Sequence, residues 1–98
     1  MKIEKKVDGT KMMIALQGRL DTMTAPELDK ELQGSLSGIA QLVFDLSKLD
    51  YVSSAGLRVL LSAQKVMNKQ GTMKVLHANS IVLKIFQATG FADVLTIE

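Results

Sequence analysis

The chain has no cysteine, a single histidine and a single proline among its 98 residues. Without cysteine it has no disulfide, no thiol chemistry and no cysteine ligand for a metal, a composition typical of a reducing cytoplasm. One histidine and separated carboxylates provide no clustered metal ligands. The sequence also lacks a Walker-type or Gly-x-Gly-x-x-Gly loop that would hold a nucleotide. We therefore expect no metal and no cofactor.

Long apolar runs and clusters of positive charge are absent as well. No run approaches the roughly 18 apolar residues of a membrane-spanning helix, and the N-terminus does not resemble a signal peptide. Twelve basic and ten acidic residues give a formal charge of +2, and the basic residues are scattered. This composition favours a cytoplasmic protein that neither inserts into a membrane nor binds nucleic acid directly.

The sequence does contain enough apolar residues for one core. Hydrophobic residues make up 47% of the chain, and its length suits one compact domain rather than two. No repeat, low-complexity tract or linker interrupts it. We expect residues 1–98 to form a single domain.

The first half of the chain predicts a hairpin and a helix. A charged edge strand over 2–7 and an apolar strand over 12–16 are joined by an Asp-Gly turn. Thr24 and Glu27 then have the spacing of a capping box at a helix start. Leucines recur every four residues along the apolar face of this helix, and a glycine marks its end: Leu28, Leu32, Leu36 and Gly38.

The second half alternates strands and helices. An apolar strand over 42–46, covered on both faces, leads through a loop over 47–52 to a mostly buried helix over 55–69. A strand over 73–76, a helix from Ser80 to Gly90 and an optional strand over 94–97 follow. The predicted order is β-β-α-β-α-β-α-(β), an α/β fold with a mixed sheet.

Sites in such sheets lie at the carboxyl ends of the strands. Residues 18–22 follow the second strand and residues 50–56 follow the third, so both loops share one rim if these strands are neighbours. Asp21 and Thr22 belong to the first loop. They are candidates for a site, or for a purely local role in the turn.

Ser53 and Ser54 stand where the second helix begins. The first N–H groups of a helix lack intrahelical partners and lie at the positive end of its dipole, so they stabilise a phosphate. Capping is the structural alternative for both serines. Gly56 costs the first turn up to about 1 kcal/mol relative to alanine, which indicates that something approaches its backbone closely. Both interpretations of the two serines, as helix caps and as a phosphate site, therefore remain open.

A hydrolase is the enzyme hypothesis that the residues allow. Ser54 would be the nucleophile, and the base and orienting groups would come from Asp21, Asp45 and His77. The sequence has no Gly-x-Ser-x-Gly elbow, and the only histidine follows a different strand. His77 is better interpreted as a polar residue at a strand end. We therefore do not expect an enzyme.

Two segments together resemble the bacterial anti-sigma factor antagonists, which are single STAS domains. Gly18-Arg19-Leu20-Asp21-Thr22-Met23-Thr24-Ala25 is similar to a Gly-x-Leu-Asp-x-x-Thr-Ala pattern. Asp45-Leu46 and Ser53-Ser54-Ala55-Gly56-Leu57 are similar to an Asp-Leu…Asp-Ser-Ser/Thr-Gly-Leu pattern. The resemblance covers nearly the whole chain. It departs from the family where Ser53 replaces a frequent aspartate and Ala55 replaces a serine or threonine.

The resemblance implies that Ser54 is phosphorylated, because it aligns with the family's target serine; Ser53 is the secondary candidate. It also implies a partner-binding surface around this serine, formed by Asp21, Thr22, Thr24, Ser53, Ala55, Gly56, Leu57 and Arg58. The chain ends at Glu98, where relatives often carry another helix. Part of the sheet is therefore expected to lack its cover.

The function that the resemblance implies is partner switching. The unphosphorylated protein binds an anti-sigma factor that is also a serine kinase of the histidine-kinase-like ATPase type, and a sigma factor is released. Phosphorylation of the serine ends the binding, and a metal-dependent serine phosphatase restores it. The protein is thus a substrate in the cycle and has no catalytic residues of its own.

Two alternatives from other functional classes remain. STAS domains also serve as accessory subunits of membrane lipid transporters, where they dock without being phosphorylated. Partner switching can equally regulate a target other than a sigma factor. The partner, rather than the sequence of this chain, determines that output.

Overall fold

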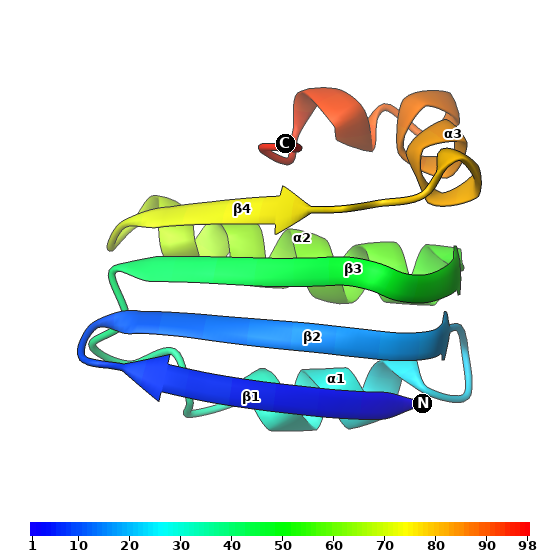
Figure 1. Cartoon of the computed structure of the whole chain (residues 1–98). Helices are drawn as coiled ribbons and strands as arrows, with labels where there is room; N and C mark the ends of the chain where they lie inside the picture. The colour runs from blue at the N-terminus through cyan, green and yellow to red at the C-terminus, as the bar shows by residue number, and fades with distance from the viewer.

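The computed structural model describes residues 1–98 as a four-stranded sheet with three α-helices. Figure 1 shows the elements, which are β1 (Lys2–Asp8), β2 (Lys11–Leu20), α1 (Ala25–Leu32), β3 (Gln41–Val52), α2 (Ser54–Asn68), β4 (Thr72–Leu76), α3 (Ser80–Ala88) and the 3-10 helix η1 (Phe91–Asp93). The predicted α/β order is confirmed through α3. The optional last strand is reduced to one bridge between Val75 and Ile97.

The sheet is mixed, and its strands lie in the order β1-β2-β3-β4. The edge strand β1 is antiparallel to β2, and the hairpin closes at the pair Asp8 and Lys11. β2, β3 and β4 run parallel to one another. The carboxyl ends of β2 and β3 therefore lie side by side. This is the condition under which the loops after these two strands share one rim of the sheet.

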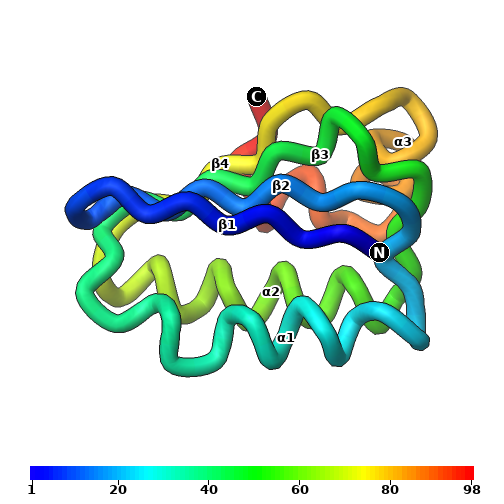
Figure 2. Tube along the Cα trace, turned by 60° about the horizontal axis from the view of Figure 1, so that its bottom comes forward, coloured from blue at the N-terminus to red at the C-terminus, as the bar shows by residue number.

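Helices α1 and α2 lie next to each other across one face of the sheet (Figures 1 and 2). Alternate residues of β2 point into this layer, and Met12, Ile14 and Leu16 are buried there. Leu28 of α1 and Leu60 of α2 are fully buried opposite them. This layer is the core that holds both helix starts at fixed positions relative to the sheet.

The opposite face of the sheet carries no helix and faces the viewer in Figure 1. α3 lies beyond the end of β4 and packs beside β3, with Val82 and Phe86 in the core. The prediction that β3 is covered by elements on both faces is therefore wrong, although Val43 on the open face is still buried.

β3 extends to Val52, so the loop predicted over 47–52 is wrong. Its pairing with β2 changes register between Ala15 and Gln17 and again between Gly18 and Arg19. Such bulges break the alternation of buried and exposed residues, which made the segment resemble a loop. Gly18 lies at the second bulge with a φ of +105°, a conformation that few other residues adopt.

Three helix ends also differ from the prediction. α1 ends at Leu32 instead of Gly38, because the next residue, Gln33, is already extended (φ −62°, ψ 124°). Thr24 precedes α1 but forms no capping hydrogen bond, so the predicted capping box is wrong. Asn79, and not Ser80, caps α3 by accepting a hydrogen bond from Val82 N–H at 2.9 Å.

No helix is sufficiently long and apolar to cross a membrane.

Candidate functional site

The two candidate loops meet at one rim of the sheet. Arg19 pairs with Tyr51 and Leu20 pairs with Val52 at the ends of β2 and β3. The Ser53 N–H then donates to the Leu20 carbonyl at 2.8 Å. The start of α2 is thus fastened directly to the end of β2, and the prediction of a shared rim is confirmed.

The paired serines have different environments at the start of α2. Ser53 is the extended N-cap (φ −91°, ψ 174°), and its half-buried hydroxyl accepts from the Gly56 N–H at 3.4 Å. Ser54 is the first helical residue, is exposed, and its hydroxyl forms no hydrogen bond within the chain. Ser53 is therefore the cap of α2, whereas the Ser54 hydroxyl caps nothing and has no hydrogen-bond partner within the chain.

The electrostatic surroundings of Ser54 suit an added anion. The first turn of α2 contains no acidic residue, so the positive end of the helix dipole is not already neutralised there. Arg58 follows one turn later and is exposed. A negative group on Ser54 would meet unsatisfied N–H groups and a nearby guanidinium.

Asp21 and Thr24 form a closed turn between β2 and α1. The Asp21 carboxylate accepts from the N–H groups of Met23 and Thr24 at 3.0 and 3.1 Å. The Thr24 hydroxyl accepts from the Asp21 N–H at 2.9 Å and donates to the Arg19 carbonyl at 2.7 Å. The hydrogen bond from Thr24 N–H is the main reason why the pKa of Asp21 lies below its ordinary value of 3.8. Asp21 is therefore charged at neutral pH. It has the local role that was one of its two predicted alternatives, since it holds the turn by accepting from two backbone N–H groups.

A hollow of about 320 Å³ opens between the starts of α1 and α2, beside this turn. Three of the predicted partner-binding residues, Thr22, Ala55 and Arg58, line it. The rest of the lining comes from Ala25, Pro26, Asp29, Val59 and Ser62. The structure thus brings residues from both signature segments to one exposed surface.

Three residues of the rim were not predicted from the sequence. Met23 is 83% exposed at the tip of the turn, an unusual position for a large apolar side chain. The Arg19 guanidinium lies 4.5 Å from the centre of the Tyr51 ring, a cation–π arrangement. Arg19 lies opposite Tyr51 only because of the two register shifts between β2 and β3. The one sign of these bulges in the sequence is the glycine at position 18.

Comparison with known proteins identifies the family. Residues 2–98 match the model of the STAS domain. The chain belongs to the STAS domain family.

Individual relatives agree with this assignment. The chain is 38% identical to BtrV of Bordetella bronchiseptica over 95 residues, which cover 94% of this chain and 80% of that protein. It is 26% identical to the anti-sigma-B factor antagonist of Bacillus subtilis, with 98% of this chain and 89% of that protein covered. STAS-domain antagonists of this kind are regulatory binding proteins and not enzymes.

The fold is also that of SpoIIAA, an anti-sigma factor antagonist whose structure is known in two forms. The unphosphorylated form has a TM-score of 0.78 at 16% identity, covering 99% of this chain and 87% of SpoIIAA. The phosphorylated form of SpoIIAA from Bacillus has a TM-score of 0.77 at 16% identity, covering 99% and 91%. At this identity the comparison shows a shared STAS fold.

Two of the predicted contact residues of this STAS domain lie beneath its surface. Gly56 is buried, and Leu57 is 4% exposed. A Cβ atom on Gly56 would lie 2.6 Å from Leu20 Cγ and 3.0 Å from the Leu20 carbonyl oxygen. The close approach that the glycine indicated is therefore made by Leu20 of the same chain. Direct contact of Gly56 and Leu57 with a partner is not supported, because both pack under the rim.

The residues of the hydrolase hypothesis are not joined into a catalytic arrangement. No hydrogen bond links Ser54 to Asp21, Asp45 or His77 in this STAS domain. His77 is exposed and follows β4 with a φ of +63°. Asp45 instead accepts from the Ser47 N–H at 3.0 Å, and this bond is the main reason why its pKa is lowered.

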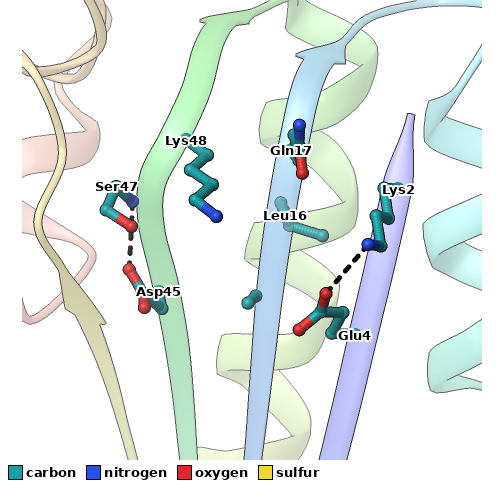
Figure 3. A pocket seen from close by; sticks show the side chains of 8 residues that line it. Lys2, Glu4, Leu16, Gln17, Asp45, Ser47 and Lys48 are labelled. Atoms are coloured by element: carbon teal, nitrogen blue, oxygen red, sulfur yellow. Dashed lines mark hydrogen bonds and ion pairs between the residues drawn. The ribbon is translucent and has the colours of Figure 1, made fainter.

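Asp45 belongs to a second hollow, of about 140 Å³, on the bare face of the sheet (Figure 3). Figure 3 shows Ser47 beside Asp45, Lys48 extending from β3 toward β2, and the ion pair of Lys2 with Glu4 along β1, at 3.2 Å. Its lining is polar and balanced in charge, and it contains none of the predicted partner-binding residues. No group of three acidic or histidine side chains could hold a metal ion.

Proposed function

We propose that this STAS domain is an anti-sigma factor antagonist that is switched off by phosphorylation of Ser54. The observation that carries the proposal is the exposed Ser54 hydroxyl, without any hydrogen bond, at the first position of α2. It lies beside a rim to which both signature segments contribute. The name of the Bacillus subtilis relative and the two forms of SpoIIAA support the same function.

The partner in this proposal is an anti-sigma factor that is also a serine kinase of the histidine-kinase-like ATPase type. The unphosphorylated protein binds it through the exposed rim around Thr22, Ser54, Ala55 and Arg58 and frees a sigma factor. A metal-dependent serine phosphatase regenerates the binding form. This cycle uses ATP and operates in the cytoplasm.

In this proposal the switch acts at the interface and not on the fold, and the physical chemistry of a helix start supports this. A phosphoserine carries about −1.5 to −2 charges, and a helix N-terminus stabilises such an anion by roughly 0.3–2 kcal/mol. Burying the same anion against a partner without a matching cation costs several kcal/mol. Phosphorylation should therefore leave α2 folded and prevent binding.

Ser54 is preferred over Ser53 as the acceptor on structural grounds. The Ser53 hydroxyl is half-buried and already accepts from the Gly56 N–H. A kinase would have to break that cap, whose loss typically costs about 1 kcal/mol. The Ser54 hydroxyl can be reached without any such change.

Phosphorylation with a kinase and mass spectrometry test the proposal. The wild type, Ser54→Ala and Ser53→Ala are incubated with ATP and the ATPase encoded nearest to this gene. We expect one phosphoryl group on the wild type and on Ser53→Ala, and none on Ser54→Ala. Circular dichroism establishes that both variants are folded. Equal phosphorylation of Ser54→Ala and the wild type would overturn the assignment.

A further inference from the structure

Arg58 is an exposed cation of the rim that forms no ion pair within the chain. Arg19, the other arginine, lies 3.8 Å from the Asp21 carboxylate and over the Tyr51 ring. Arg58 is therefore the arginine that remains available to a new anion.

Arg58 also stands at the helical spacing that lets it reach a group on Ser54. Residues four apart on a helix are surface neighbours, with about 5–6 Å between their Cβ atoms. The order is the favourable one, because the anion would lie toward the N-terminus and the cation toward the C-terminus. Both side chains are exposed, so neither has to leave a packed position to meet the other.

The hollow between α1 and α2 leaves the Arg58 side chain accessible to a docked partner. Arg58 and Asp29 are the only charged residues that line it, and they form no ion pair with each other. Asp29 accepts instead from the Gln33 side chain at 3.2 Å. Arg58 is thus the only cation in the lining and the group there that an acidic side chain of a docked partner would bind.

We propose that Arg58 exchanges one anion for another when the switch operates, an inference that rests on phosphorylation of Ser54. In the unphosphorylated protein, Arg58 binds an acidic side chain of the anti-sigma factor. After phosphorylation, the phosphate on Ser54 captures the same guanidinium within α2. Phosphorylation then weakens binding in two ways. It adds a negative charge that is costly to bury against the partner, and it removes the contact between Arg58 and the acidic side chain of the partner. Arginine suits this exchange because its planar fork binds carboxylates and phosphates bidentately.

Capture is tested on protein in which phosphoserine is placed at position 54 by genetic encoding, so that no kinase is needed. The second pKa of a phosphoserine is about 6, and a paired guanidinium lowers it. We expect Arg58→Gln to raise this pKa by roughly 0.3 pH unit, as measured by ³¹P NMR titration. Lys65→Gln is the matched control, since it removes a positive charge from the exposed side of the same helix. Identical titrations of wild type and Arg58→Gln would overturn the capture step.

The partner contact is tested by the affinity of the unphosphorylated protein for its anti-sigma factor. We expect Arg58→Gln to weaken binding about tenfold and Lys65→Gln to leave it unchanged. An unchanged affinity for Arg58→Gln would overturn the contact. The ³¹P titration does not depend on a kinase, so failure of the kinase to modify Ser54 would contradict the proposed function alone.

Discussion

Asp21 and Thr24 each hold the backbone of the other. The Asp21 carboxylate accepts from the Thr24 N–H at 3.1 Å, and the Thr24 hydroxyl accepts from the Asp21 N–H at 2.9 Å. This reciprocal pair closes the turn that leads from the end of β2 into α1. This turn positions Thr22 and Met23 on the rim beside Ser54.

Removing the Thr24 hydroxyl should open this turn. Thr24→Val keeps the shape of the side chain but leaves the Asp21 N–H and the Arg19 carbonyl without their partner. We expect the free energy of unfolding to fall by about 1–2 kcal/mol in urea titrations. Thr22→Val is the matched control, because Thr22 is exposed and its hydroxyl, unlike that of Thr24, forms no hydrogen bond within the chain. Equal stabilities of the two variants would show that the pair does not hold the turn.

The charge on Asp21 should make stability depend on pH in the acid range. Its pKa in the folded protein is lowered, chiefly by the Thr24 N–H. The carboxylate therefore contributes stability at pH above its unfolded-state pKa of about 3.9. This contribution is lost as the pH falls through the lower folded-state value. The urea midpoint of wild type should exceed that of Asp21→Asn at neutral pH, and the difference should shrink in acid. A difference that is constant with pH would exclude this role of the charge.

Gly56 should not tolerate a side chain, despite its position in a helix. Alanine is normally the better helix former by up to about 1 kcal/mol. At this position its Cβ would lie 2.6 Å from Leu20 Cγ, and overpacking of this kind typically costs about 1–3 kcal/mol. We expect Gly56→Ala to unfold at a lower temperature than the wild type.

Ser54→Ala is the control for Gly56→Ala, because it changes an exposed residue of the same helical turn. We expect its stability to stay within about 0.5 kcal/mol of the wild type. A Gly56→Ala variant as stable as Ser54→Ala would mean that Leu20 moves away at no cost.

The order of elements could be predicted from the sequence because each element has a local signal. Alternation in β2, leucines at helical spacing in α1 and the apolar residues of α2 all follow from burial of one face in the core. The paired serines and the Asp21 loop were likewise placed correctly at one rim. The β/α alternation predicts parallel strands whose carboxyl ends lie at one edge, and the structure shows that β2 and β3 are neighbours there.

The remaining features depend on contacts that are distant in the sequence. The end of β3 resembled a loop, since its bulges are defined only by the partner strand β2. Thr24 resembled a capping residue, but its hydroxyl is held by Arg19 and Asp21 instead. The close neighbour of Gly56 is Leu20, which lies 36 residues earlier in the chain. Local patterns alone could not predict these pairings.

Phosphorylation should leave the backbone of the domain unchanged. The helix start at Ser54 stabilises an anion, so no element has to unfold to accept it. Amide chemical shifts of protein with phosphoserine at position 54 should change only near the first turn of α2 and the neighbouring rim. Widespread changes across β1, β4 or α3 would contradict a switch that acts at the interface.

The affinity of the two forms for the cognate anti-sigma factor tests the central claim most directly. Isothermal titration would compare the unmodified protein with protein that carries phosphoserine at position 54. Desolvation of the phosphate costs several kcal/mol, and each 1.4 kcal/mol is a factor of ten. We predict binding by the unmodified form and binding weaker by roughly 100-fold or more for the phosphorylated form. Equal affinities would contradict the assignment of Ser54 as the switch.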